Sequence, residues 1–278
     1  PETALALGIM KKGWGYRLCY RFSRALLQNA DGIVTIGQKM SEHISTYTSS
    51  EKYITVIPNW ADGKKIRPVD RTQDSFRKKL KLKDVYTAIF AGNMGIAQEI
   101  DVLIELVKAF KGRRDIQFLF MGGGVRRADL EEIVSKNQIE NVRFLNYQDR
   151  ADLSPYLGLA DIGIVTLSSQ LEGLAIPTKT YSYLAAGIPI LAIASENSEL
   201  KIFSEQDLGV HFTPEPIERI IEFLDIEIKR ERRRRSHLIR NYFEVHLDRA
   251  CQTQKYLALL QALDSEATAL ELETTQPS

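Results

Sequence analysis

The chain has 278 residues, 44% of them hydrophobic, so it can bury the core of one large domain or of one domain and part of another. Its 37 basic residues nearly balance 36 acidic ones, and the net charge of +1 gives no overall field that favours nucleic acid. No apolar run approaches the roughly 20 residues that a membrane-spanning helix needs. Cys19 and Cys251 lie far apart without metal-ligand spacing, which is typical of free thiols and predicts a cytoplasmic protein.

Residues 1–60 contain a predicted basic amphipathic helix at 14–28 and two predicted strands at 33–36 and 53–57. The turn-rich residues 57–62 then predict a linker between two domains. Because Pro1 is followed almost directly by an apolar stretch, we expect the natural polypeptide to be longer and residues 1–60 to be the remnant of an amino-terminal domain. The helix is expected either to pack against the rest of that domain or to rest on the cytoplasmic face of a membrane.

Residues 61–228 alternate short apolar runs with segments of helical period, which predicts an α/β domain with a doubly wound parallel sheet. The right-handed crossovers of such a sheet place its ligands at the carboxyl ends of the strands. The predicted strands are residues 86–90, 116–121, 142–145, 162–167, 189–193 and 209–212.

Two glycine turns follow the first two of these strands. Gly92, Asn93 and Gly95 lead from a strand into a helix that is expected to begin near Gln98, a geometry that points free backbone N–H groups at an anion such as phosphate. A tight turn between strand and helix would need the same glycines. Three further glycines, Gly122, Gly123 and Gly124, occupy the equivalent place after the next strand, and the two turns together favour a nucleotide lying across the strand ends.

A more specific signal lies in residues 172–189. Pro177 and Thr178 can begin a helix that Gly187 ends, which would place Lys179 in the first turn, where its charge can meet a diphosphate. A solvated lysine is the alternative. The chain has no Asp-x-Asp pair, the spacing by which many enzymes that use sugar nucleotides hold a divalent metal, so protein groups are expected to neutralise the phosphates without a metal or another cofactor.

The last part of the chain is predicted to be helical and charged over residues 229–270, followed by a tail at 271–278. The basic run at residues 229–235 is typical of a solvated helix face, with contact to anionic lipid headgroups as the alternative.

On the motifs at residues 56–62, 90–95, 121–124 and 177–189, in this order and spacing, the sequence resembles the retaining glycosyltransferases of the GT-B type, family 4 or group 1, and among them the members that assemble exopolysaccharide and O-antigen. The resemblance covers nearly the whole chain. It implies a UDP-sugar donor bound mainly by the carboxyl-terminal domain, and a glycan or lipid-linked acceptor bound mainly by the amino-terminal one.

The resemblance also implies roles for individual residues. Gly92, Asn93 and Gly95 would line the pyrophosphate, Lys179 would contact it, and Glu172 would approach the hydroxyls of the transferred sugar. Two positions depart from the family pattern: Asn93 and Gln98 stand where many relatives carry an arginine and a lysine, and Ser182 stands where relatives usually place a glutamate that binds ribose.

The sequence therefore predicts a hexosyl- or N-acetylhexosaminyltransferase of polysaccharide biosynthesis that acts with retention. Two alternatives stay open: a catalytically incomplete nucleotide-binding module of a polysaccharide assembly complex, and a sugar-nucleotide epimerase of the same architecture.

Overall fold

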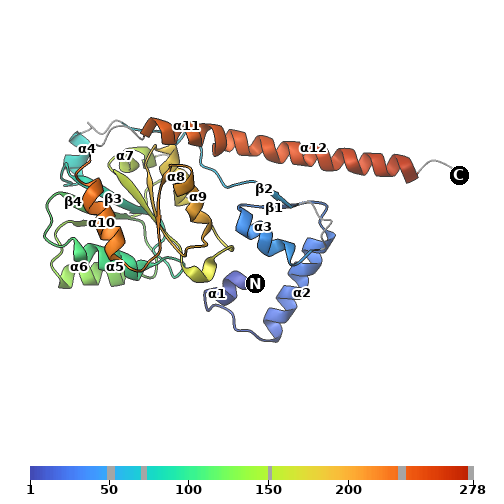
Figure 1. Cartoon of the computed structure of the whole chain (residues 1–278), viewed down its shortest axis with the longest axis horizontal. Helices are drawn as coiled ribbons and strands as arrows, with labels where there is room; N and C mark the ends of the chain where they lie inside the picture. The colour runs from blue at the N-terminus through green and yellow to red at the C-terminus, as the bar shows by residue number, and fades with distance from the viewer. Residues whose placement is uncertain (49–53, 70–73, 150–151, 231–235, 275–278) are drawn as a thin grey trace.

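The computed structural model describes residues 1–48, 54–69, 74–149, 152–230 and 236–274. These form a large α/β unit around a six-stranded sheet and a smaller unit around a two-stranded sheet, with one long helix that projects from the large unit (Figure 1). The predicted parallel α/β architecture is thus confirmed.

The six-stranded sheet has the order β5-β4-β3-β6-β7-β8, and every neighbouring pair is parallel. The chain runs outward from β3 to β5 and then returns to β6 beside β3, so the order reverses between β3 and β6. The strands are β3 (Tyr86–Ala91), β4 (Ile116–Met121), β5 (Val142–Leu145), β6 (Ile162–Thr166), β7 (Ile190–Ile193) and β8 (Gly209–Phe212). All six predicted strands are present, with ends that differ by at most one residue.

Helices cover both faces of this sheet, which explains why its central strands are apolar on both sides. One face packs against α5 (Ile100–Ala109), α6 (Arg127–Lys136) and α10 (Glu218–Glu227). The other packs against α7 (Leu153–Leu157), α8 (Lys179–Ala185), α9 (Ile202–Glu205) and α11 (Ser236–His246). Shorter elements are α4 (Asp74–Lys79), η2 (Ser169–Leu171) and η3 (Glu199–Lys201).

The smaller unit holds α1 (Glu2–Ala6), α2 (Trp14–Asn29), β1 (Ile33–Thr35), α3 (Gln38–Ser45) and β2 (Ile54–Val56). Its strands β1 and β2 are parallel. The carboxylate of Glu199, from the large unit, accepts hydrogen bonds from the backbone N–H groups of Gln38 (2.5 Å) and Lys39 (2.9 Å). It therefore caps α3 from the other unit, because the first N–H groups of a helix have no partner within the helix.

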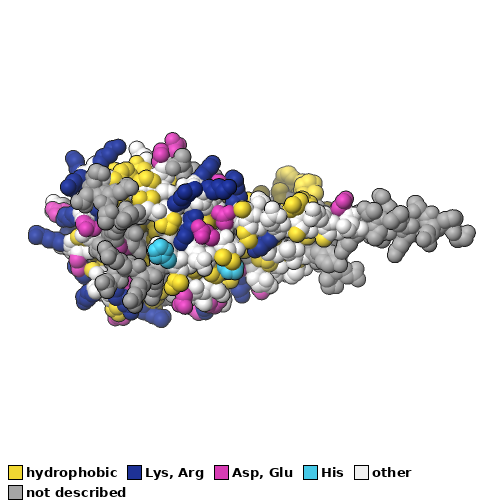
Figure 2. Space-filling model, turned by 90° about the horizontal axis from the view of Figure 1, so that it is seen from above, with side chains coloured by type: hydrophobic (Ala, Val, Ile, Leu, Met, Phe, Trp, Pro, Cys, Tyr) yellow, Lys and Arg dark blue, Asp and Glu magenta, His cyan; other side chains and the backbone are white. Residues whose placement is uncertain are grey.

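The helical segment predicted after residue 229 is two helices, α11 and α12 (Arg249–Thr274), separated at Leu247 and Asp248. Within the basic run at 229–235, residues 231–235 lie outside the described residues, as do residues 275–278 of the predicted tail. Viewed from above, basic and acidic side chains are interspersed over the large unit, as the near-zero net charge implies (Figure 2). Within the described residues, no helix has the length and apolar character that a bilayer crossing requires.

Candidate functional site

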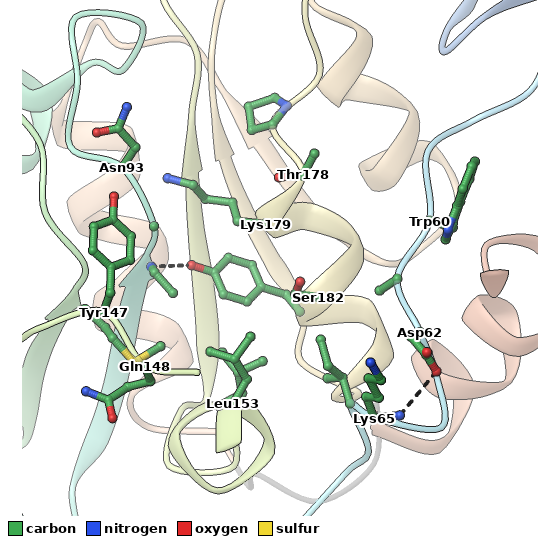
Figure 3. Close-up of a pocket in the computed structure, with 18 of the residues that line it drawn as sticks. Trp60, Asp62, Lys65, Asn93, Tyr147, Gln148, Leu153, Thr178, Lys179 and Ser182 are labelled. Atoms are coloured by element: carbon green, nitrogen blue, oxygen red, sulfur yellow. Dashed lines mark hydrogen bonds between the residues drawn. The ribbon is translucent and has the colours of Figure 1, made fainter. Parts of the chain in front are cut away.

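A pocket of about 710 Å³ opens at the carboxyl edge of the sheet, next to the reversal of strand order between β3 and β6. Its walls come from segments far apart in the sequence: the linker at 60–66, the turn after β3, the loop after β5, α7, the start of α8 and the start of α12 (Figure 3). This is the edge at which doubly wound sheets bind their ligands.

Lys179 begins α8 and extends across the pocket toward the turn after β3 (Figure 3). Its Nζ donates to Oε1 of Gln98 at 3.1 Å and lies 3.3 Å from the centre of the Phe90 ring. Burial lowers the pKa of the Lys179 ammonium well below its ordinary value, and among the described residues no carboxylate offsets this effect. An amino group that is buried without an anionic partner is a site that an anionic ligand can complete.

Gly92 forms the wall that faces Lys179. Its φ of +124° lies in a region that side chains rarely adopt, and a Cβ there would lie 3.5 Å from Cε of Lys179. Asn93 follows it and also lines the pocket, with its side chain near that of Tyr147 in the view of Figure 3. The turn after β3 and the lysine thus face one another across the crevice.

The second glycine turn lies behind the first and is not among the residues that line the pocket. The N–H of Gly92 donates to the Met121 carbonyl at 2.7 Å, and the N–H of Met94 donates to the Gly123 carbonyl at 2.6 Å. A Cβ on Gly122 would lie 2.0 Å from the Gly92 carbonyl oxygen, and one on Gly124 would also meet the first turn, at Asn93. These glycines are therefore needed for the two turns to pack together.

The other residues predicted to bind the donor divide into two groups. Gln98, Thr178 and Ser182 line the pocket with Gly92, Asn93 and Lys179. Gly95 does not line it, and a Cβ there would lie 2.9 Å from Nδ2 of Asn93. Gln98 has a second partner, because the Thr166 hydroxyl donates to its Oε1 at 3.2 Å. The residue that replaces a positive charge of the family pattern is therefore a hydrogen-bond acceptor for Lys179.

Glu172 lies away from the lining of this pocket, beside the smaller unit. The Ser195 hydroxyl donates to its Oε2 at 2.6 Å, and the neighbouring Gly173 approaches the backbone of Lys39. The structure therefore does not bring Glu172 together with Lys179 in one pocket; it places this carboxylate near the boundary between the two units.

The pocket also contains residues that the sequence analysis did not single out. Tyr147 and Gln148 come from the loop after β5, and Arg249 comes from the first turn of α12. The position of Tyr147 could have been inferred, because β5 is parallel to its neighbours and ends at the same edge of the sheet. Arg249 could not, because only tertiary contacts bring α12 to the pocket.

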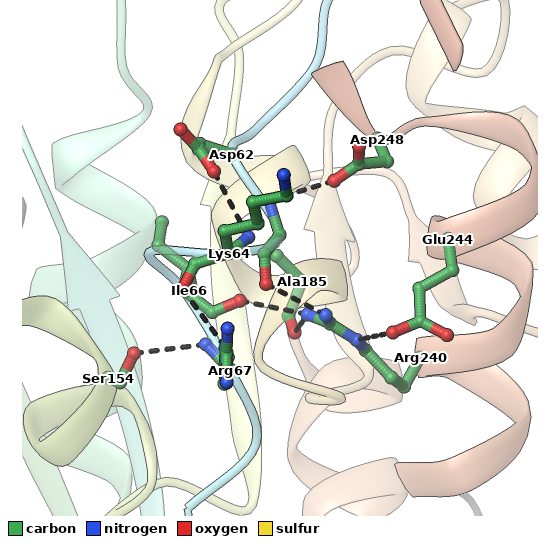
Figure 4. Close-up of polar contacts among 10 residues, drawn as sticks. Asp62, Lys64, Ile66, Arg67, Ser154, Ala185, Arg240, Glu244 and Asp248 are labelled. Carbon is green, nitrogen blue, oxygen red and sulfur yellow. Dashed lines mark hydrogen bonds and ion pairs between the residues drawn. The ribbon is translucent and has the colours of Figure 1, made fainter. Parts of the chain in front are cut away.

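Polar contacts hold the linker against α8 and α11 (Figure 4). The Arg240 guanidinium donates to the carbonyl oxygens of Gly63 (2.9 Å), Ile66 (2.8 Å) and Ala185 (2.5 Å), and it pairs with Glu244 at 2.7 Å. Each donor–acceptor contact orders backbone that would otherwise be free to move. The linker is therefore a fixed wall of the pocket.

The start of α12 and the linker are also joined. The Asp248 carboxylate accepts the N–H of Gly63 at 2.9 Å, and Arg249 pairs with Asp62 at 3.2 Å. Within the described ranges, no three His, Cys, Asp or Glu side chains are grouped as a metal site requires.

The family model described as "Glycosyl transferases group 1" matches residues 72–242, which include all but the linker and α12 walls of the pocket. Among curated proteins, the chain is 28% identical over 216 residues to the probable glycosyltransferase WbjE of Pseudomonas aeruginosa. It is 26% identical over 220 residues to the putative colanic acid biosynthesis glycosyl transferase WcaI of Escherichia coli K12. Each alignment covers 77% of this chain and 54% of the relative, so the chain spans about half the length of these relatives.

Solved structures show the same fold. Sucrose-phosphate synthase from Thermosynechococcus elongatus is 17% identical with a TM-score of 0.72, and the match covers 90% of this chain and 62% of that one. Anabaena HepE in complex with UDP-glucose is 13% identical with a TM-score of 0.72, and the match covers 88% of this chain and 68% of that one. The likeness confirms the predicted GT-B type of fold. Because the family model matches more than half of its residues, this chain belongs to the group 1 glycosyl transferases.

Proposed function

We propose that the pocket binds a nucleoside-diphosphate sugar, with UDP as the nucleotide, for transfer of the sugar to a glycan or lipid-linked acceptor with retention. The observation that carries the proposal is the buried amino group of Lys179, which faces the Gly92 turn across the crevice without a carboxylate partner in the described structure. HepE, a neighbour in fold, has been solved with UDP and with UDP-glucose, which supports the choice of nucleotide.

Transfer separates the sugar from a diphosphate, so negative charge develops on the leaving oxygen. A fixed cation in a site of low dielectric stabilises that charge without reorganisation. Lys179 would supply the cation, and backbone N–H groups of the turn at Gly92 and Asn93 would supply hydrogen bonds. We therefore propose that transfer needs no metal. Activity that survives EDTA and does not rise with Mg²⁺ or Mn²⁺ would support this, and activity that requires a metal would contradict it.

Glu172 is proposed to contact the hydroxyls of the transferred hexose or N-acetylhexosamine. Its carboxylate now accepts a hydrogen bond from Ser195, so it already has the chemistry to accept one from a sugar hydroxyl. A Glu172→Gln variant is expected to bind UDP as wild type does while losing transfer activity, because the nucleotide pocket does not include this side chain. Weaker UDP binding would contradict the assignment.

The site of action is proposed to be polysaccharide assembly in the cytoplasm, with peripheral contact to the membrane through α2. Trp14, Leu18, Phe22 and Leu26 form an exposed apolar stripe on this helix, which contains no acidic residue. Exposed arginines at 17, 21 and 24 run beside the stripe. Such a face is suited to an anionic bilayer surface.

Vesicle sedimentation tests this contact. Vesicles that contain roughly 30% anionic lipid have a surface that attracts several basic side chains. They are expected to sediment the wild-type chain, and neutral vesicles are not. A Phe22→Glu variant is expected to stay in the supernatant. Equal sedimentation with both kinds of vesicle, or of both proteins, would contradict an electrostatic contact through α2.

Two other functions remain to be separated from transfer. Ser182 lines the pocket where relatives usually place a glutamate that binds ribose. Its short, uncharged side chain favours the first alternative, a nucleotide-binding module without catalysis. A sugar-nucleotide epimerase of the same architecture is the second alternative. Mass spectrometry of products distinguishes the three, because transfer makes a larger glycan, epimerisation makes an isomer and a module makes no product.

Calorimetric titration of the chain with UDP, UDP-sugars and uridine tests the proposal as a whole. UDP is expected to bind more tightly than uridine, because Lys179 contacts the phosphates. If neither UDP nor a UDP-sugar binds, the proposed function is wrong.

A further inference from the structure

The phenol of Tyr183 lies at the point where the order of the strands reverses. Strands β3 and β6 are neighbours there, but their register contains only Ala88 with Ile162 and Ile89 with Gly163. On the other side of β3, by contrast, all six residues are paired with β4. The two strands at the reversal therefore separate toward their carboxyl ends.

The Tyr183 hydroxyl occupies the gap between them. It accepts the backbone N–H of Ala91 at 2.7 Å (dashed in Figure 3) and lies 3.4 Å from the carbonyl oxygen of Ile89 and 3.5 Å from that of Ile164. Ile89 and Ala91 belong to β3, and Ile164 belongs to β6. One hydroxyl thus contacts backbone groups of both strands, in a place without solvent exposure.

The opposite strand is adapted to the ring. A Cβ on Gly163 of β6 would lie 2.3 Å from Cδ2 of Tyr183, so any larger residue at 163 would displace the ring. The glycine and the tyrosine therefore form a matched pair that fixes how far β3 and β6 separate.

Tyr183 and Lys179 lie one turn apart on α8, so they share a face of the helix. The tyrosine hydroxyl is hydrogen-bonded to the N–H of Ala91, the residue immediately before Gly92, while the lysine faces Gly92 itself. The distance from the lysine to the glycine turn is consequently set by a buried hydrogen bond within the pocket wall, because Ala91 and Tyr183 both line the pocket.

We propose that Tyr183 is a positioning residue for the diphosphate of the nucleotide: its hydroxyl holds the end of β3 at the separation from α8 that lets Lys179 and the Gly92 turn bind the phosphates together. The inference rests on the proposed nucleotide function. It concerns the phosphates, because the hydroxyl holds the backbone immediately before the Gly92 turn that faces Lys179.

The test compares Tyr183→Phe with Tyr181→Phe. Tyr181 is a matched control, since it is equally buried on the same helix and its hydroxyl is hydrogen-bonded to the backbone of Asn59, outside the lining of the pocket. Both variants are expected to lose thermal stability. Only Tyr183→Phe is expected to lower the ratio of UDP to uridine affinity, by roughly tenfold. Without the hydroxyl, the end of β3 is no longer held where Lys179 and the Gly92 turn can bind the phosphates together.

A ratio that is unchanged in Tyr183→Phe, or that falls equally in Tyr181→Phe, would overturn the positioning role while leaving UDP binding by the wild type intact. Absence of UDP binding by the wild type would instead overturn the proposed function. If Tyr183→Phe does not fold, replacement of Ala91 by lactic acid removes the N–H donor as a backbone ester and keeps the tyrosine. The same fall in the ratio is then expected, and its absence would overturn the proposal.

Discussion

Replacing Lys179 by methionine would remove the charge that faces Gly92 and keep an unbranched side chain. A hydrogen bond to a charged group contributes about 1.5–3 kcal/mol. The loss of one such contact with a phosphate should weaken UDP binding by about 10- to 160-fold. Uridine carries no phosphate, so its affinity should change by less than about threefold.

The same substitution should stabilise the unliganded protein at neutral pH. Burial lowers the pKa of Lys179 well below its ordinary value, so between the folded and unfolded pKa values the unfolded chain binds more protons. The free energy of unfolding therefore rises with pH through this window, and at neutral pH the buried ammonium is a cost to folding. Lys179→Met removes that cost, and its Tm without ligand should exceed that of the wild type.

A bound diphosphate favours the charged lysine, so it raises the pKa of Lys179 and draws a proton from the solvent when the amine is partly neutral. Calorimetric titrations with UDP at pH 8, in two buffers of different ionisation enthalpy, measure this uptake. The terminal phosphate has a pKa of about 6 and should contribute almost none of it. The wild type should take up a fraction of a proton and Lys179→Met none. Equal uptake by both proteins, or equal losses of UDP and uridine affinity, would refute the reasoning.

Two further changes test how the pocket is built. Gly122→Ala should lower the free energy of unfolding by at least about 2 kcal/mol, because its methyl would clash with the Gly92 carbonyl at a positive φ. Gly112→Ala, with a positive φ and open space, should cost only about 1 kcal/mol, and equal urea midpoints would contradict the clash. Arg240→Met should cost about 2–4 kcal/mol, since it leaves three carbonyls without their donor. The more exposed Arg249→Met should cost less than about 1 kcal/mol, and equal losses for the two arginines would contradict the role given to the linker contacts.

Much of the large unit could be predicted from the sequence, because a strand buried on both faces is a short apolar run and each crossover helix has one apolar face. The three strands at 116–121, 142–145 and 209–212 have the predicted bounds for this reason. The position of Lys179 at the start of α8 also followed from local signals, since Pro177 and Thr178 precede a helix and Gly187, with φ +73°, follows it.

The rest of the pocket depends on contacts between distant segments. Arg249 lies at the pocket where Asp248 and Arg240 bind the linker, and no local pattern encodes that pairing. The role of the second glycine turn is likewise set by a contact between distant segments. The sequence predicted that Gly122 lets a ligand approach the backbone, whereas the structure has the Gly92 carbonyl beside it.

The linker contacts also determine where the two units can turn relative to one another. Ile57 is tied to the smaller unit, since its N–H donates to Thr35 of β1 at 2.9 Å. Asn59 is tied to the large unit through the Tyr181 hydroxyl, and the backbone from residue 61 onward is bound by α11 and α12. Only Pro58 lies between these two anchors. An opening of the molecule that keeps both anchors must therefore turn within residues 57–59, where the ring of Pro58 already fixes one backbone torsion.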